Sequence, residues 1–250
     1  MEIYFFLLGL IIFLGLSKLK HKNSFIFILL FLVSALRFDV GYDYISYYNV
    51  INYLDENNYN RFGIIDQLLI NISRSIDFYQ FYFIATSFFV IYLITVTLKK
   101  FSENYFFSIL IFITIPIFYL LSFSIIRQFV AISIVFYSLR YIVKRNLLKY
   151  LLLIFVAFLF HISAIIATPI YFLYRNKFSK KFAVLLLLLL SFFLSSVLVI
   201  IIQKYMPIYA SYIYESARFG KNLFYFFVLI YIFVLMNYKY IRNNNASFFF

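Results

Sequence analysis

The feature that most constrains this chain is a series of apolar runs separated by short basic joints. A run of about 20 apolar residues crosses a bilayer as a helix, because a helix pairs its backbone polar groups without water. Only 12% of the residues are charged, against roughly 25% in soluble domains. We therefore predict an all-α, polytopic helical membrane protein, a single integral membrane domain over residues 1–250 with about seven to nine transmembrane segments. The runs lie at about 3–17, 24–36, 81–98, 106–123, 128–143, 182–202 and 223–237.

The joints between the runs indicate how the chain is oriented. Cytoplasmic loops of membrane proteins carry an excess of lysine and arginine. Ten of the thirteen lysines lie in "KLKHKN", "KKFSEN", "VKRNLLK" and "RNKFSKK", so we expect these joints on the cytoplasmic side. The N terminus, residues 37–80 and the "SIIRQ" turn are then predicted to face outward. The net charge of +13 comes from short joints and forms no single basic stripe, so we expect no nucleic-acid partner.

Residues 150–174 conflict with this pattern, since both ends look cytoplasmic while the length suits one crossing. The middle, "FLFHISAIIATPI", interrupts the apolar run with polar residues and a proline. Two readings stay open. One is a broken span, with half-length helices or a re-entrant pair meeting near the outer side. The other is a single tilted span with a basic flank on each side.

The segment 37–80 is predicted to be a long external loop. It holds six of the nine acidic residues and no lysine. Within it, "FGIIDQLLINISRSI" predicts an amphipathic helix lying on the outer membrane surface. An external loop with such a helix is a candidate roof over a binding site. The apolar residues at helical spacing are Ile65, Leu68, Leu69, Ile72 and Ile76.

Two arginines lie at predicted outer ends of spans, where a charge usually faces a cavity or a partner. We expect Arg37 and Arg127 to face one external entrance. An arginine can bind two phosphate oxygens at once and keeps its charge when partly dehydrated. The alternatives are contact with lipid headgroups or, for Arg37, an ion pair with Asp39. Arg127 has no acidic residue nearby in "SIIRQFVA", which favours a functional role.

Two aspartates and a histidine are candidates for proton transfer. Asp39 and Asp43 flank Gly41, which indicates a loop or a helix start. Each either caps backbone amides or acts on a sugar hydroxyl, and Asp43 is the stronger candidate for a general base. His161 is the one histidine inside an apolar run, and it is either a hydrogen-bonded structural residue or a proton carrier near neutral pH.

The tyrosines of the same segment and the missing residue types bound the chemistry further. Tyr44, Tyr47 and Tyr48 either stack on sugar rings or belong to the interfacial aromatic belt. The absence of cysteine excludes disulfides, thiol catalysis and thiolate metal sites, and with two histidines we expect no multi-histidine metal site. We predict that it uses no metal and no cofactor.

Three short segments carry a resemblance to a known family. "RFDVGYDYISYY" resembles an R-x-x-V-G-x-D-Y signature, "SIIRQFVAISIVFYSLRYI" an I-R-Q-x-x-A-x-S segment, and "FHISAIIATPIYFL" an F-H-x-S-A segment. All three are features of the EpsG family of Wzy-like bacterial polysaccharide polymerases, and the likeness covers residues 30–175. The chain departs from the family at Tyr42, where threonine is usual, and at "NRFGIID", which replaces an E-P-G-type stretch.

The resemblance implies a metal-independent glycosyltransferase in the bacterial cytoplasmic (inner) membrane. Such an enzyme joins oligosaccharide repeat units carried on undecaprenyl pyrophosphate, at the outer face, into exopolysaccharide, capsule or O-antigen. The implied partners are lipid-linked oligosaccharide, membrane lipids, and a flippase and chain-length regulator of the same pathway. The implied catalytic residues are Arg37, Asp43, Arg127 and His161. The implied substrate-binding residues are Asp39, Tyr44, Tyr47, Tyr48, Gln128 and Ser163.

Other functions are compatible with the same residues. A polyprenyl-phosphate-sugar transferase also places acidic residues in its first external loop and differs in its donor. A lipid-oligosaccharide flippase or another transporter is expected to line several spans with polar residues, whereas here they gather at the outer ends of spans. An accessory or inactive relative is a further alternative.

Overall fold

The computed structural model describes residues 2–53, 59–60 and 62–175, and every regular element in these ranges is helical. The chain divides into two units, 1–177 and 178–250, and all described residues belong to the first. The predicted runs at 182–202 and 223–237 lie outside the described residues, as do the lysines of "RNKFSKK".

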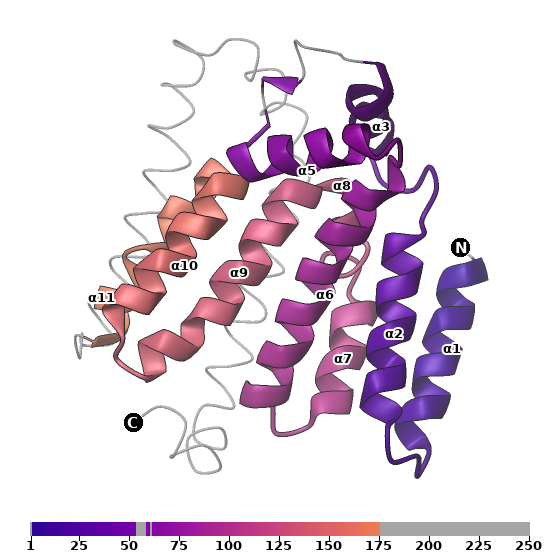
Figure 1. The fold of residues 1–250 in the computed structure, drawn as a ribbon. Helices are drawn as coiled ribbons and strands as arrows, with labels where there is room; N and C mark the ends of the chain where they lie inside the picture. The colour runs from indigo at the N-terminus through magenta and orange to yellow at the C-terminus, as the bar shows by residue number, and fades with distance from the viewer. Residues whose placement is uncertain (1, 54–58, 61, 176–250) are drawn as a thin grey trace, which may run out of the picture. The chain divides into compact units, whose positions relative to one another are not determined.

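Six apolar helices run side by side in this unit (Figure 1). They form at or near the predicted runs, and their buried residues, such as Ile26, Ile91 and Val130, share one core. Within the described part, α6 and α9 are long and apolar enough to cross a membrane, whereas the other apolar helices have 10–17 residues. The six are α1 (Glu2–Leu16), α2 (Lys22–Ala35), α6 (Gln80–Phe101), α7 (Tyr105–Thr114), α9 (Ile126–Val143) and α10 (Leu147–Phe160).

The predicted run 106–123 does not form one continuous helix. Helix α7 ends at Thr114, two residues before Pro116. A proline disfavours helical backbone in the residue before it, and Ile115 is extended, with φ −87° and ψ 109°. At about 1.5 Å per residue, the 10 residues of α7 cover only part of a hydrocarbon core of about 30 Å. An irregular stretch and the short α8 (Leu121–Ser124) then lead into α9.

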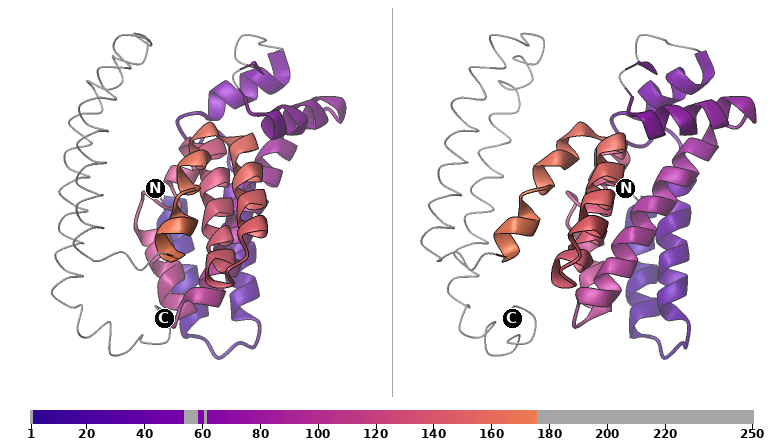
Figure 2. Two further views of the ribbon diagram at one scale, coloured as in Figure 1. Left: turned by 90° about the vertical axis from the view of Figure 1, so that its left-hand side faces the viewer. Right: turned by 60° about the vertical axis from the view of Figure 1, so that its left-hand side comes forward.

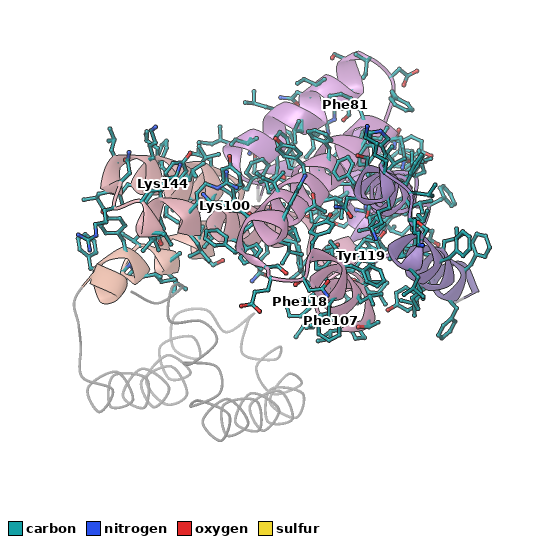
Figure 3. The ribbon with its side chains drawn as sticks, turned by 90° about the horizontal axis from the view of Figure 1, so that it is seen from below. Phe81, Lys100, Phe107, Phe118, Tyr119 and Lys144 are labelled. Carbon is teal, nitrogen blue, oxygen red and sulfur yellow. The ribbon has the colours of Figure 1, made fainter. Side chains whose placement is uncertain are left out.

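The lysine-bearing joints gather at one end of the bundle. The connections α1–α2, α6–α7 and α9–α10 all lie there, opposite α5 (Figure 1). Lys100 and Lys144 are both seen when this end is viewed from below (Figure 3). We call it the basic end, and the opposite one the α5 end. Its lysines are Lys18, Lys20, Lys22, Lys99, Lys100, Lys144 and Lys149.

Two helices lie across the opposite end of the bundle (Figures 1 and 2). These are α3 (Tyr44–Tyr53) and α5 (Ile64–Ser75). The amphipathic helix predicted in this segment is therefore present as α5. Its buried residues are Asp66, Ile70 and Ser73, however, while Leu68 and Ile72 from the predicted apolar face are exposed.

The segment 150–174 is interrupted at its histidine. Helix α10 ends at Phe160, His161 is extended, and a 3₁₀-helix (η1, Ile162–Ala167) and α11 (Ile170–Arg175) follow. Tyr150, near the start of α10, donates a hydrogen bond of 2.6 Å to the carbonyl oxygen of Ala167. The chain therefore turns back at His161 and returns alongside α10.

Candidate functional site

A glycine fastens the loop after α2 to the segment before α9. Gly41 has φ +108°, and a Cβ built on it would lie 2.1 Å from the carbonyl oxygen of Phe123. The backbone N–H of Tyr42 donates to Ser124 Oγ at 3.1 Å. Only glycine combines this backbone angle with so close an approach. The contact holds Asp43 and the start of α3 beside the start of α9.

A second glycine brings α5 against the end of α10. Gly63 is the N-cap of α5, and a Cβ built on it would lie 2.3 Å from the carbonyl oxygen of Leu159. Leu159 lies two residues before His161. The two glycine contacts therefore gather the three motif-bearing segments at the α5 end.

Arg127 is the second residue of α9 and is half-buried at this junction. Its Nε donates a hydrogen bond of 3.2 Å to the hydroxyl of Tyr47 on α3. Its guanidinium lies over the ring of Phe62, 4.5 Å from the centroid. Within the described part of the chain, no side-chain hydrogen bond caps the N terminus of α9, and the start of a helix favours an anion. Arginine and helix start together make a positively polarised corner.

The titratable groups on which the charge of Arg127 acts include two carboxyls and a histidine from different elements, besides the hydroxyls of Tyr47 and Tyr82. The carboxyls and the histidine are Asp43 before α3, Asp66 on α5 and His161 after α10. Burial raises the pKa of the Asp43 carboxyl, and Arg127 opposes that rise. Burial also raises the pKa of Asp66, to about 7, against the opposing effects of a hydrogen bond from Tyr82 and of Arg127. Carboxyls with raised pKa values can exchange protons near neutral pH.

Asp66 and Tyr82 are site residues that the sequence did not predict. Asp66 is completely buried, and the Tyr82 hydroxyl donates to its Oδ1 at 2.7 Å. The signal in the sequence is spacing: Asp66 lies four residues after Phe62 and four before Ile70, and both of those are buried. The prediction for this helix followed the neighbouring leucines and isoleucines, as a face lying on the membrane surface, and so did not single out Asp66.

Arg37 lies inside the bundle and not on an external entrance. Only 7% of it is exposed, and its guanidinium lies 5.1 Å from the ring centroids of both Phe83 and Phe123. Its Nη1 donates to the carbonyl oxygen of Ser34 and, at 3.0 Å, to Ser87 Oγ.

The space beside Arg37 is a cavity of about 10 Å³. A single water needs roughly 10–15 Å³, so no pyrophosphate fits there in this conformation. Among the described residues, Arg37 also makes no ion pair with Asp39, which is exposed with φ 49°. Arg37 is therefore buried and Asp39 is exposed, although they are only two positions apart in the sequence.

Two of the three predicted tyrosines are interior residues. Tyr44 stacks on Phe83 with centroids 4.6 Å apart, and Tyr47 stacks on Tyr82 with centroids 5.2 Å apart. Both are 2% exposed or less, so neither presents a free ring face to a sugar in this conformation or lies in an interfacial belt. Tyr48 is half-buried and meets Tyr79 edge-on at 5.0 Å.

The remaining candidates are less connected. Gln128 follows Arg127 on α9, and Ser163 lies in η1, two residues after His161. Both are half-buried. Within the described ranges, no hydrogen bond joins either side chain to the other candidates. Of the predicted residues, the structure thus gathers Asp43, Tyr47, Arg127 and His161, and it places Arg37 and Asp39 elsewhere.

The fold and the site define a class of protein: a bundle of apolar membrane-type helices whose described part has a positively polarised, carboxylate-containing cluster at the end opposite the lysine-bearing joints. The chain belongs to the EpsG family, whose sequence profile matches residues 23–250. The predicted resemblance is thereby confirmed, and it places the chain among membrane proteins of polysaccharide biosynthesis. Searches of curated proteins and of solved structures found no match.

Proposed function

We propose that the protein is a glycosyltransferase that polymerises oligosaccharide repeat units carried on undecaprenyl pyrophosphate, at the outer face of the cytoplasmic membrane. The observation that carries the proposal is the position of Arg127. It lies in the first turn of α9, at the α5 end, with Asp43 and His161 within reach of its charge. Family membership supplies the link to polysaccharide biosynthesis.

The reaction divides among these residues by chemistry. The acceptor hydroxyl oxygen attacks the anomeric carbon of the donor sugar and forms the new glycosidic C–O bond. The bond from that carbon to the pyrophosphate oxygen breaks, and undecaprenyl pyrophosphate leaves with the electron pair. Arg127 stabilises the negative charge that develops on the leaving group. Asp43 or His161 takes the proton of the acceptor hydroxyl.

Orientation supports the outer face as the site of the reaction. The lysines of the three described joints lie at the basic end, which the positive-inside rule assigns to the cytoplasm. The α5 end then faces outward. A donor anchored by its lipid in the outer leaflet would bring its pyrophosphate to this end.

The test is reconstitution of the purified protein in lipid nanodiscs with a lipid-linked repeat unit. The expected products are oligomers of increasing length and free undecaprenyl pyrophosphate. Arg127→Lys should lose most of the oligomers. Arg145→Lys, an exposed residue at the basic end, is the matched control and should keep them. Incorporation from a polyprenyl-monophosphate sugar alone would support the rival transferase. In proteoliposomes, movement of unchanged substrate across the bilayer without a new bond would support a flippase.

A further inference from the structure

A completely buried carboxylate lies behind the residues that hold Arg127. Asp66 is in the first turn of α5, with Oδ1 accepting the hydrogen bond from Tyr82. Its Oδ2 is also buried and has no hydrogen-bond partner among the described residues. Burying an ionisable group that is only half satisfied is costly. An apolar side chain at this position would pack without that cost. We therefore infer that Asp66 has a role beyond packing.

Asp66 is connected to Arg127 through two tyrosines. Its partner Tyr82 stacks on Tyr47 with an angle of 25° between the rings. The Tyr47 hydroxyl in turn accepts the hydrogen bond from Arg127 Nε. On the other side, Phe62, just before the N-cap of α5, meets Tyr47 edge-on at 5.1 Å and lies with its ring face against the Arg127 guanidinium. The start of α5 therefore holds Arg127 from two directions.

The titratable groups around this connection come from several elements. The groups are Arg37 after α2, Asp43 before α3, Tyr47 on α3, Tyr82 on α6, Arg127 on α9 and His161 after α10. The Tyr82 hydrogen bond and the charge of Arg127 both favour the ionised form of Asp66, while burial disfavours it. With the pKa of Asp66 raised to about 7, both forms are populated near neutral pH.

We propose that Asp66 is a positioning residue of the Arg127 site. Its carboxylate fixes Tyr82, and the Tyr82–Tyr47 stack then fixes the hydroxyl that orients the Arg127 guanidinium toward an anionic substrate. This role deepens the proposed function and rests on it. Asp66 itself contacts no substrate, since it is enclosed by α5, Tyr82 and their neighbours.

The test compares Asp66→Asn and Tyr82→Phe with wild type in the polymerisation assay, between about pH 5.5 and 8.5. Wild-type kcat/KM should rise through a step near pH 7, as Asp66 ionises. Asp66→Asn should remove that step and lower the plateau roughly 10- to 100-fold. Tyr82→Phe should move the step to higher pH, because its hydroxyl stabilises the carboxylate. The step should persist in His161→Gln, although the rate falls, which separates it from histidine titration.

A structural role alone would give a different result. Asp66→Asn and Tyr82→Phe would then change only the amount of folded protein, and the pH profile per folded molecule would match that of wild type. That outcome overturns the proposal, as does full activity in Asp66→Asn.

A binding measurement separates this inference from the proposed function. Calorimetry with inorganic pyrophosphate reports on Arg127 without requiring polymerisation. Wild type should bind more tightly than Arg127→Gln, and Asp66→Asn should lose about tenfold in affinity with loss of the step near pH 7. If wild type makes no polymer, the proposed function fails. The pyrophosphate affinities of wild type and Asp66→Asn still test the positioning role of Asp66. Equal affinity and equal pH dependence in wild type and Asp66→Asn would overturn the positioning role.

Discussion

The α-carbon of Gly41 faces the carbonyl oxygen of Phe123 so closely that a methyl group on it would lie 2.1 Å from that oxygen. These two residues are far apart in the sequence, and their contact joins the loop after α2 to the segment before α9. Asp43 lies two residues after Gly41, and Arg127 lies four residues after Phe123. The positions of both candidate residues thus depend on residue 41 having no side chain.

Gly41→Ala is therefore expected to destabilise the protein by about 2 to 4 kcal/mol, since it adds a backbone clash to a left-handed conformation. Gly9→Ala is the matched control. A Cβ on Gly9 meets nothing within 4 Å, and alanine is favoured over glycine inside a helix. Thermal unfolding in detergent measures both variants, and equal unfolding temperatures for them would contradict the contact.

Arg127→Lys is expected to lower polymer formation about 100- to 1000-fold, or about 2.7 to 4 kcal/mol in the barrier, by analogy with loss of an oxyanion donor. Lysine keeps the charge, but its ammonium cannot lie over Phe62 as a planar group while a second nitrogen bonds Tyr47. Tyr47→Phe removes only the hydroxyl and should cost about tenfold. Chain-length analysis of surface polysaccharide at matched protein levels is the measurement. Normal chains in Arg127→Lys would remove Arg127 from the site.

Asp66→Asn should make the protein more stable at pH 8 while lowering its activity. The pKa of Asp66 is raised to about 7 in the folded state, so the folded protein holds this proton more tightly than the unfolded chain. Stability is therefore lost as the pH rises from about 4 to 7, and the loss is constant above that range. Asparagine does not ionise, so its advantage should grow through this window to on the order of 2 to 4 kcal/mol. Unfolding temperatures of both proteins from pH 5 to pH 8 would show it, and an advantage independent of pH would refute the raised pKa.

Membrane orientation can be tested with single cysteines, because the natural chain has none. Ser75→Cys at the end of α5 should react with an impermeant maleimide in intact cells, whereas Lys144→Cys at the basic end should react only after lysis. Both side chains are exposed, so reactivity reports the side of the membrane rather than burial. The reverse pattern would place Arg127 on the cytoplasmic side and exclude an outer-face reaction.

Local features were predictable from the sequence. The helices α1, α2, α6 and α9 form where apolar runs were seen, because hydropathy and backbone pairing act within one segment. The family and the lysine-bearing joints were also predictable, because short motifs and clustered lysines are visible within single segments. The end of α7 was also encoded locally, by Pro116, but the length of the surrounding apolar run concealed it.

Burial of single side chains was not predictable in this way. Arg37 and Asp39 are two residues apart, yet the first lies between two aromatic rings and the second is exposed. The partners that decide this, Phe83 and Phe123, come from other elements. Tyr44 and Tyr47 had the composition of interfacial residues and became core residues, because α3 packs on α5 and α6.

The sequence by itself determined that this is an apolar, helical chain of the EpsG family, with ten of its thirteen lysines in joints and an arginine at the start of α9. Those properties depend on the length, hydropathy and order of residues. Only the tertiary structure decided that Asp66 is buried against Tyr82 and that Tyr47 holds Arg127. Such contacts join residues from different helices, and their energies depend on which faces pack together, a choice that no single segment contains.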